Sequence, residues 1–186
     1  ADVLLLDGRD DAFLELVGQL GVEGLPDVIV VPVGSMGTAA GLLVGSCLAG
    51  AFGKARLEGV NVADPMFTSD ASMRDEAWKL DAFIRFRMSR EDRDRFPHCD
   101  YGSRRALKFV SAYYEPGYGA ARPSVFEGMK LVERTERIKL DSTYSGKAMR
   151  YFLDRQAAAI RDGSAMKGEK VMFWLTYNSH DLNEII

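Results

Sequence analysis

Apolar residues along the chain form two kinds of pattern, short continuous runs and longer stretches at helical spacing. Val28–Val33 is almost entirely β-branched, which is typical of a parallel strand buried on both faces. Asp10–Leu20 instead places its apolar residues on one face of a helix and is followed by Gly21 as a stop signal. The two patterns follow one another in turn, so the sequence predicts strands that alternate with helices.

The same patterns predict the other elements. The predicted strands are Val3–Leu6, Val28–Val33, Leu57–Val62, Leu107–Tyr113 and Lys170–Thr176. The predicted helices are Asp10–Leu20, a small-residue helix that runs through Ala51, Asp70–Arg87, Ser124–Arg137 with Ser124 as its cap, and Tyr144–Arg161. Strands that alternate with helices favour a parallel sheet with right-handed crossovers. We therefore expect a single α/β domain over residues 1–186, with a parallel sheet between two layers of helices.

Composition and charge exclude several classes of partner. The 186 residues are 47% hydrophobic, enough for a real core, and carry 24 basic against 27 acidic side chains, a net charge of −3. Without a basic block, nucleic acid is not an expected partner. The longest apolar stretch, Ala39–Phe52, is interrupted by glycines and is too short to cross a bilayer. The alternating charges of Arg85–Arg95 predict a solvated helical face.

The cysteines predict no covalent or metal framework. Cys47 and Cys99 are isolated in the sequence, so we expect neither a disulfide nor a zinc site, and a reducing cytoplasm is the expected location. The cluster His98-Cys99-Asp100 lies on one predicted loop, where adjacent residues rarely converge on a single site. No signal peptide is recognisable, and the start at Ala1 suggests a trimmed product or a fragment.

The turn after the strongest strand is the most informative place for chemistry. In a parallel sheet, ligands bind beyond the carboxyl ends of the strands. There the segment Gly34-Ser35-Met36-Gly37-Thr38 leads from a strand into a helix, and backbone N–H groups and two hydroxyls can meet an anion. The spacing is that of neither a dinucleotide fingerprint nor a nucleotide P-loop. A phosphate-binding loop and a merely tight turn, with Ser35 and Thr38 as helix caps, both fit this pattern.

Three blocks of the sequence resemble one enzyme group. Val30–Gly45 (VVPVGSMGTAAGLLVG), Tyr114–Gly119 (YEPGYG) and Leu140–Met149 (LDSTYSGKAM) occur in the order found in fold-type II pyridoxal-phosphate enzymes. They are most similar to the D-cysteine desulfhydrase and 1-aminocyclopropane-1-carboxylate deaminase group, and Phe173–Asn178 lies where this group carries its last strand and turn. The resemblance spans nearly the whole chain and implies a partial tryptophan synthase beta-like fold.

The resemblance implies a role for particular residues. Gly34, Ser35, Met36, Gly37 and Thr38 would bind the phosphate of pyridoxal 5'-phosphate, and Thr176 would lie beside the pyridine nitrogen. Tyr144 matches the tyrosine that faces the substrate. Ser145 stands where the deaminases have Glu and the desulfhydrases Thr, which favours the desulfhydrase-like side because a serine supplies no counter-charge. Lys147 is not the cofactor's lysine in this group and is expected to be structural.

The chain also departs from the group's pattern. Met36 replaces a Gly or Ala, so its side chain must either point away from the phosphate or crowd it. The last turn reads Thr176-Tyr177-Asn178 in place of Thr-Gly-Gly. The Schiff-base lysine and the substrate-carboxylate loop belong to an N-terminal part that the resemblance does not include. The chain therefore corresponds to the C-terminal part of the large cofactor-binding domain.

These observations lead to three hypotheses. The first is the C-terminal portion of a deaminase or desulfhydrase that converts a small amino acid to ammonia and a 2-oxo acid, inactive as this isolated chain. The second is a non-catalytic module that binds phosphate or pyridoxal phosphate without the lysine. The third is a fragment with no independent role. Because truncation would expose a sheet edge and a cleft, we expect self-association or binding to the missing half.

Overall fold

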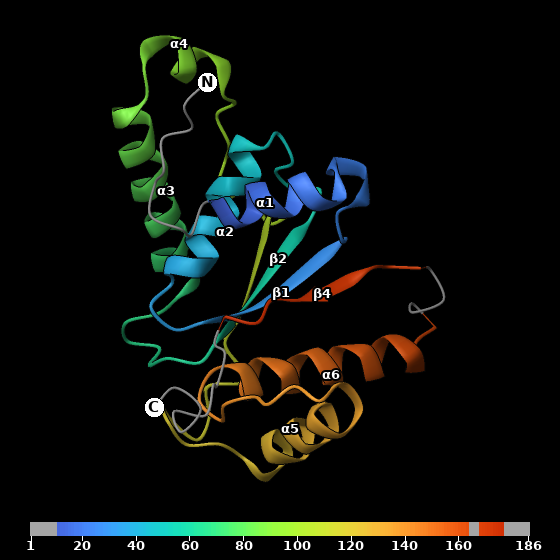
Figure 1. The fold of residues 1–186 in the computed structure, drawn as a ribbon. Helices are drawn as coiled ribbons and strands as arrows, with labels where there is room; N and C mark the ends of the chain where they lie inside the picture. The colour runs from blue at the N-terminus through green and yellow to red at the C-terminus, as the bar shows by residue number, and fades with distance from the viewer. Residues whose placement is uncertain (1–10, 164–167, 177–186) are drawn as a thin grey trace, which may run out of the picture.

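The computed structural model describes residues 11–163 and 168–176 and contains a parallel sheet in the order β3-β2-β1-β4 (Figure 1). The strands are β1 (Val28–Val33), β2 (Arg56–Asn61), β3 (Leu107–Val110) and β4 (Val171–Phe173). All three pairings are parallel, with Val28 opposite Arg56 and Val171, and Leu57 opposite Leu107. The predicted strand Val3–Leu6 lies outside the described residues.

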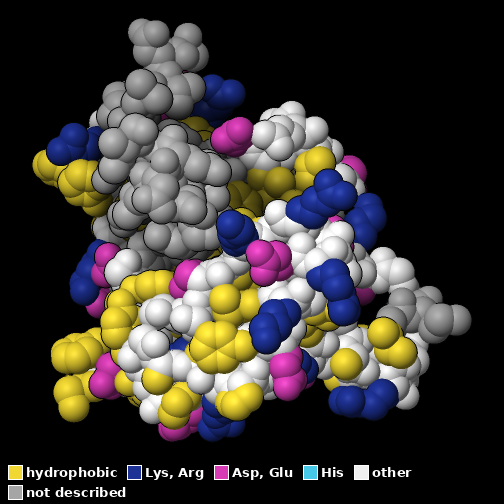
Figure 2. All heavy atoms as spheres, turned by 60° about the horizontal axis from the view of Figure 1, so that its bottom comes forward, with side chains coloured by type: hydrophobic (Ala, Val, Ile, Leu, Met, Phe, Trp, Pro, Cys, Tyr) yellow, Lys and Arg dark blue, Asp and Glu magenta, His cyan; other side chains and the backbone are white. Residues whose placement is uncertain are grey.

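Helices cover both faces of this sheet and make three layers, as expected from the sequence (Figure 1). One layer contains α1 (Asp11–Leu20), α2 (Gly37–Leu48) and α3 (Asp70–Arg87), and the other contains α5 (Pro123–Glu136) and α6 (Ser145–Arg161). The short α4 (Arg90–Arg95) follows α3, and a 3-10 turn, η1 (Val22–Gly24), precedes β1. Figure 2, with the α5–α6 side turned forward, shows hydrophobic side chains interspersed with charged ones.

Strand β1 is the centre of the core. All six of its residues are buried. Ile29, Val31 and Val33 belong to the apolar cluster that contains the buried residues of α1, α2 and α3, whereas Val28 and Val30 pack with Ala148 and Tyr151 of α6. Strands covered on both faces tend to be apolar along their whole length, which is why the continuous run Val28–Val33 could be recognised from the sequence.

Two sequence expectations about helices are corrected. Ser124 is not the cap of α5: the helix begins at Pro123, and the preceding Arg122 makes no side-chain cap hydrogen bond. Proline has no N–H to lose and is favoured at a first helical position. The helix α4 is exposed throughout, as predicted, but Arg85 is buried and donates from Nε to Asp81 Oδ2 at 2.8 Å.

The prediction that no disulfide forms is wrong. Cys47 Sγ and Cys99 Sγ are bonded at 2.05 Å, and their Cα atoms lie 5.9 Å apart although 52 residues separate them in the sequence. The bridge links the end of α2 to the segment that precedes β3. Sequence spacing carries no signal for this pairing, because only the fold brings the two segments together. The expectation of a reducing compartment rested on unpaired cysteines and loses that support.

A buried carboxylate fastens α6 to the sheet. Glu58 in β2 has no solvent exposure, and its oxygens accept hydrogen bonds from Tyr151 Oη at 2.6 Å and Arg155 Nε at 2.9 Å. Arg56 Nη2 donates to the same carboxylate at 2.8 Å, and Lys108 Nζ lies 3.7 Å away. Burial by itself raises the pKa of Glu58, but these hydrogen bonds and cations outweigh it and hold the pKa below its ordinary value. The negative charge of the Glu58 carboxylate is therefore balanced by these donors and cations inside the fold.

None of the helices in the described ranges is both long enough and apolar enough to cross a membrane.

Reduction of the Cys47–Cys99 bond should lower the free energy of unfolding by about 4 kcal/mol, because a ring closed over 52 residues restricts the unfolded chain. Urea unfolding with and without a thiol reductant measures this difference. A Cys47→Ala, Cys99→Ala double variant is the control, and its unfolding midpoint should not respond to the reductant. An equal midpoint for the parent chain in both buffers would contradict the expectation.

Candidate functional site

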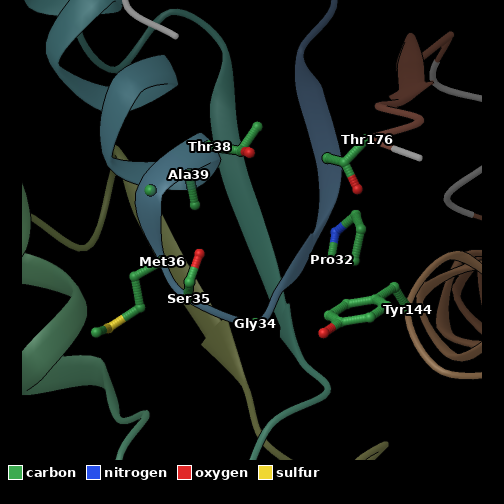
Figure 3. Close-up of a pocket in the computed structure, with 9 residues that line it drawn as sticks. Pro32, Gly34, Ser35, Met36, Thr38, Ala39, Tyr144 and Thr176 are labelled. Atoms are coloured by element: carbon green, nitrogen blue, oxygen red, sulfur yellow. The ribbon is translucent and has the colours of Figure 1, made fainter. Parts of the chain in front are cut away.

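A pocket of about 280 Å³ opens at the carboxyl end of β1. Its lining comes from three places in the sequence: the end of β1 with the following loop and first turn of α2, the start of α6, and Thr176, three residues beyond the end of β4 (Figure 3). Sequence analysis named most of these residues, and the fold brings them together. The lining residues are Pro32, Gly34, Ser35, Met36, Gly37, Thr38, Ala39, Tyr144 and Thr176.

Gly34 lets the loop pass close to α6. A Cβ atom built on Gly34 would lie only 2.7 Å from Cε1 of the Tyr144 ring, closer than side-chain contacts allow. The Gly34 carbonyl in turn accepts a hydrogen bond from Thr68 Oγ1 at 3.2 Å, and Thr68 is buried. The loop is therefore held between α6 on one side and the connection after β2 on the other.

Met36 has a left-handed backbone and directs its side chain out of the pocket. Its φ is 67°, which is uncommon for a residue other than glycine. In Figure 3 the side chain extends away from Ser35 and Thr38, and it packs against the main apolar cluster of the core. Of the two alternatives considered for this position, the structure shows the one in which methionine does not crowd the loop.

The start of α2 offers unpaired donors to the pocket. Met36 is the N-cap of the helix and makes no side-chain cap hydrogen bond, so neither Ser35 nor Thr38 acts as the predicted cap. The backbone N–H groups of Gly37, Thr38 and Ala39 belong to the first turn, where no intrahelical acceptor exists. The helix dipole places partial positive charge at the same point. Hydroxyls and N–H groups are thus available to an anion.

Among the residues that the structure describes, none with a charged side chain lines the pocket, and the attraction that these residues offer an anion comes from backbone dipoles. Thr176 lies across the pocket from the loop, beside Pro32 (Figure 3). The Thr176 hydroxyl can form a hydrogen bond with a ligand on that side of the pocket.

Tyr144 forms a pair with Tyr118, a residue that sequence analysis did not select. Tyr118 belongs to the YEPGYG block, and its hydroxyl shares a hydrogen bond with the Tyr144 hydroxyl. The bond to Tyr118, together with partial burial and the nearby Asp141 charge, raises the pKa of Tyr144, so its phenol stays neutral at ordinary pH. Tyr118 is 59% exposed and connects the pair to solvent.

Lys147 fixes the backbone of the YEPGYG block by hydrogen bonds to two of its carbonyls. Its side chain is fully buried, and Nζ donates to the carbonyls of Tyr114 at 2.8 Å and Gly117 at 2.6 Å. Desolvation lowers the pKa of this ammonium group. The prediction that Lys147 is structural is confirmed by these contacts, which set the position of Tyr118 beside Tyr144.

Asp141 fixes the first turn of α6. Its carboxylate accepts hydrogen bonds from the backbone N–H groups of Thr143 at 2.9 Å, Tyr144 at 2.6 Å and Ser145 at 3.0 Å. Ser145 is buried and its hydroxyl also donates to Asp141 Oδ2, so Ser145 is not among the lining residues. Burial raises the pKa of Asp141, but the Ser145 hydroxyl and the backbone donors outweigh it and lower the pKa overall.

Asp141→Asn should destabilise the fold at neutral pH and make its free energy of unfolding less sensitive to acid. Because the pKa of Asp141 is lower in the folded than in the unfolded chain, its carboxylate stabilises the fold above about pH 4, and this stabilisation is lost as the pH falls through the folded value. The difference in unfolding free energy between parent and variant should therefore be constant near pH 7 and shrink below about pH 4. Urea unfolding across this range is the measurement.

Asp94→Asn, at an exposed position of α4, is the matched control. A parent–Asp141→Asn difference that persists unchanged into strong acid would argue against a stabilising charge at Asp141.

Comparison with known proteins identifies the family. The family described as "Pyridoxal-phosphate dependent enzyme" matches residues 2–176. A solved structure described as an ACC deaminase homologue has a TM-score of 0.57 at 23% identity, over 88% of this chain and 44% of its own. A solved structure of a threonine deaminase from T.th. has a TM-score of 0.49 at 16% identity, over 94% of this chain and 58% of its own. The chain thus spans less than half of the ACC deaminase homologue, and it belongs to the pyridoxal-phosphate-dependent enzymes.

Proposed function

We propose that this chain is the phosphate-binding portion of a pyridoxal-phosphate enzyme that deaminates a small amino acid or eliminates from its β-carbon. The observation that carries the proposal is the pocket at the end of β1, where the Gly34–Thr38 loop faces Tyr144 and Thr176. The product would be ammonia and a 2-oxo acid. The description of one similar fold as an ACC deaminase homologue supports this class of reaction.

The donors at the start of α2 suit the phosphate group. A dianion there would accept hydrogen bonds from the free N–H groups of the first turn and from the hydroxyls of Ser35 and Thr38. Gly37 adds no side chain to the loop, and Met36 is turned outward. Pyridoxal phosphate, when bound, supplies an electron sink for the substrate's α-carbon.

The other residues of the pocket would orient the bound cofactor and supply protons at the site. Thr176 would place a neutral hydroxyl beside the ring nitrogen, which favours an unprotonated pyridine. Tyr144 would hold a proton at its phenolic oxygen, since its pKa is raised, and Tyr118 would exchange that proton with solvent. Asp141 and Lys147 would act indirectly, since one fixes the backbone of Tyr144 and the other fixes the turn that carries Tyr118.

The residues present fit the phosphate but do not provide the amine that the chemistry requires. Within the ranges 11–163 and 168–176 that the structure describes, no lysine lines the pocket, and Lys147 is committed to two backbone carbonyls. Hydrogen-bonding side chains cannot replace an amine nucleophile. A lysine from outside this chain would therefore complete the enzyme. The same observation favours a second candidate function, a non-catalytic module that binds the phosphate ester alone.

Titration of the full 186-residue chain with pyridoxal phosphate tests the proposal. We expect reversible binding that inorganic phosphate displaces, and Ser35→Ala or Thr38→Ala should weaken it by about tenfold each, because each removes a hydrogen bond to a charged group. Ser124→Ala, at the start of α5, is the control and should bind like the parent. Isothermal calorimetry gives the affinities.

Borohydride treatment separates the outcomes. After reduction, mass spectrometry of peptides should find no lysine modified in stoichiometric amount, and the chain alone should release no 2-oxo acid from small amino acids. Stoichiometric attachment at one lysine would overturn the claim that the amine is supplied from elsewhere. Binding that is unaffected by both loop substitutions would overturn the assignment of the phosphate site.

A further inference from the structure

Two consecutive carbonyls at the end of β1 are bound by the same neighbouring segment, the one that follows β2. The Val33 carbonyl accepts a hydrogen bond from the Val62 N–H at 3.1 Å. The next carbonyl, that of Gly34, accepts one from Thr68 Oγ1 at 3.2 Å. In a regular strand successive carbonyls point in opposite directions, and the other side of β1 is occupied by β4. The peptide between Gly34 and Ser35 is therefore turned out of the pattern of the strand.

The direction of this peptide decides where its N–H group points. A trans peptide is planar, so its N–H is directed opposite to its carbonyl. Because the Gly34 carbonyl is directed to Thr68, the Ser35 N–H is directed to the other side of the loop, where Tyr144 and Thr176 line the pocket (Figure 3). Within residues 11–163 and 168–176, this N–H donates to no protein group. It is therefore a donor that a ligand in the pocket can use.

We propose that Thr68 is a positioning residue for the anion site and that it acts through the Gly34–Ser35 peptide. The inference rests on the proposed function, because the anion that the Ser35 N–H would meet is the phosphate of the cofactor. Thr68 is only 3% exposed and does not line the pocket, so it contacts no ligand there. Its hydroxyl adds the Ser35 N–H to the backbone donors that the first turn of α2 already offers.

Gly34 makes such an anchor necessary. The loop requires glycine at this position, since a Cβ atom would lie 2.7 Å from the Tyr144 ring. Glycine also leaves the backbone with more conformational freedom than any other residue. The hydrogen bond from Thr68 restricts that freedom at the peptide whose direction matters for the site.

The segment that carries Thr68 is itself held by local hydrogen bonds. Asn61 Oδ1 accepts from the Ala63 N–H at 3.1 Å, and the Thr68 N–H donates to the Asp64 carbonyl, also at 3.1 Å. The next residue, Ser69, caps α3 through a capping box. These contacts do not involve the pocket, so the Thr68 hydroxyl is in place before a ligand binds. A loop that is ordered in advance loses less conformational entropy on binding.

Affinities of three variants of the full chain test this role. Thr68→Val keeps the shape of the side chain but removes the hydroxyl, and its dissociation constants for pyridoxal phosphate and inorganic phosphate should rise about fivefold. Thr68→Ser keeps the hydroxyl and should stay within about twofold of the parent. Thr135→Val is the matched control, because the Thr135 hydroxyl also donates to a backbone carbonyl, that of Leu131 at 3.0 Å, but outside this pocket. Isothermal calorimetry gives the constants.

Nuclear magnetic resonance separates positioning from a general loss of structure. In the parent and in Thr68→Ser, the Ser35 amide proton should move downfield when inorganic phosphate is added, because it donates to the anion. In Thr68→Val this movement should be lost, while amide signals away from the loop stay where they are in the parent. A Thr68→Val chain that binds phosphate as tightly as the parent, or whose Ser35 amide responds as in the parent, would overturn the proposal.

The ligand-free chain distinguishes a failure of this inference from a failure of the proposed function. Residual dipolar couplings of weakly aligned protein report the direction of the Ser35 N–H bond without any ligand. We expect the same coupling in the parent and Thr68→Ser, and a changed coupling in Thr68→Val. A parent chain that binds neither pyridoxal phosphate nor inorganic phosphate would overturn the proposed function. An N–H direction that Thr68→Val leaves unchanged would overturn the positioning role, whether or not phosphate binds.

Discussion

The carboxylate of Glu58 has to be compensated where it stands, in the middle of the sheet and away from water. An unpaired charge at such a place costs several kcal/mol, so the groups that meet it are fixed in position. Tyr151 and Arg155 reach Glu58 from one helix, and this sets both the distance and the rotation of α6 against the strands. The start of the same helix carries Tyr144. The place of a tyrosine at the pocket thus depends on contacts with a buried charge that are made further along α6.

The two layers of helices contribute to the pocket in different ways. From one side, α2 presents its N-terminus, with backbone donors that no side chain caps. From the other side, α6 presents the Tyr144 phenol, which shares a hydrogen bond with Tyr118 of the turn held by Lys147. One layer therefore provides positive potential and the other provides exchangeable protons. A ligand with an anionic end and a reactive ring end would meet both, which is why we propose a phosphorylated cofactor for this pocket in place of an inorganic ion alone.

Local patterns predicted what depends on local physics. The continuous apolar run of β1 and the bounds of α3 were both predicted correctly, because burial on two faces and helical spacing are visible in a short window. The loop Gly34–Thr38 could also be found locally, because a glycine-containing turn between a strand and a helix is visible in a short window. Fold class followed from the order of these elements. The strand predicted at Leu107–Tyr113 is shorter in the structure, where β3 ends at Val110.

Contacts between distant segments could not be predicted in this way. The sequence around Cys47 and Cys99 does not predict that they form a disulfide. In the same way, the sequence does not predict which residues of α6 bind Glu58 of β2. Tyr118 was visible within a family block, but its bond to Tyr144 arises only when two loops fold together. Ser145 was expected at the cofactor from the resemblance alone, and no sequence pattern indicated that its hydroxyl donates to Asp141. Each of these depends on tertiary structure.

The disulfide also changes the length to which the polypeptide can be drawn out. The ring that it closes contains β2, α3 and α4, a span of 52 residues that the bond withdraws from the path between the two ends of the chain. A fully extended residue contributes about 3.5 Å, so the oxidised polypeptide is shorter at full extension by about 180 Å. The strands β1 and β4 lie outside the ring, and a force applied to the ends would act on them while β2 and α3 remain shielded from the load.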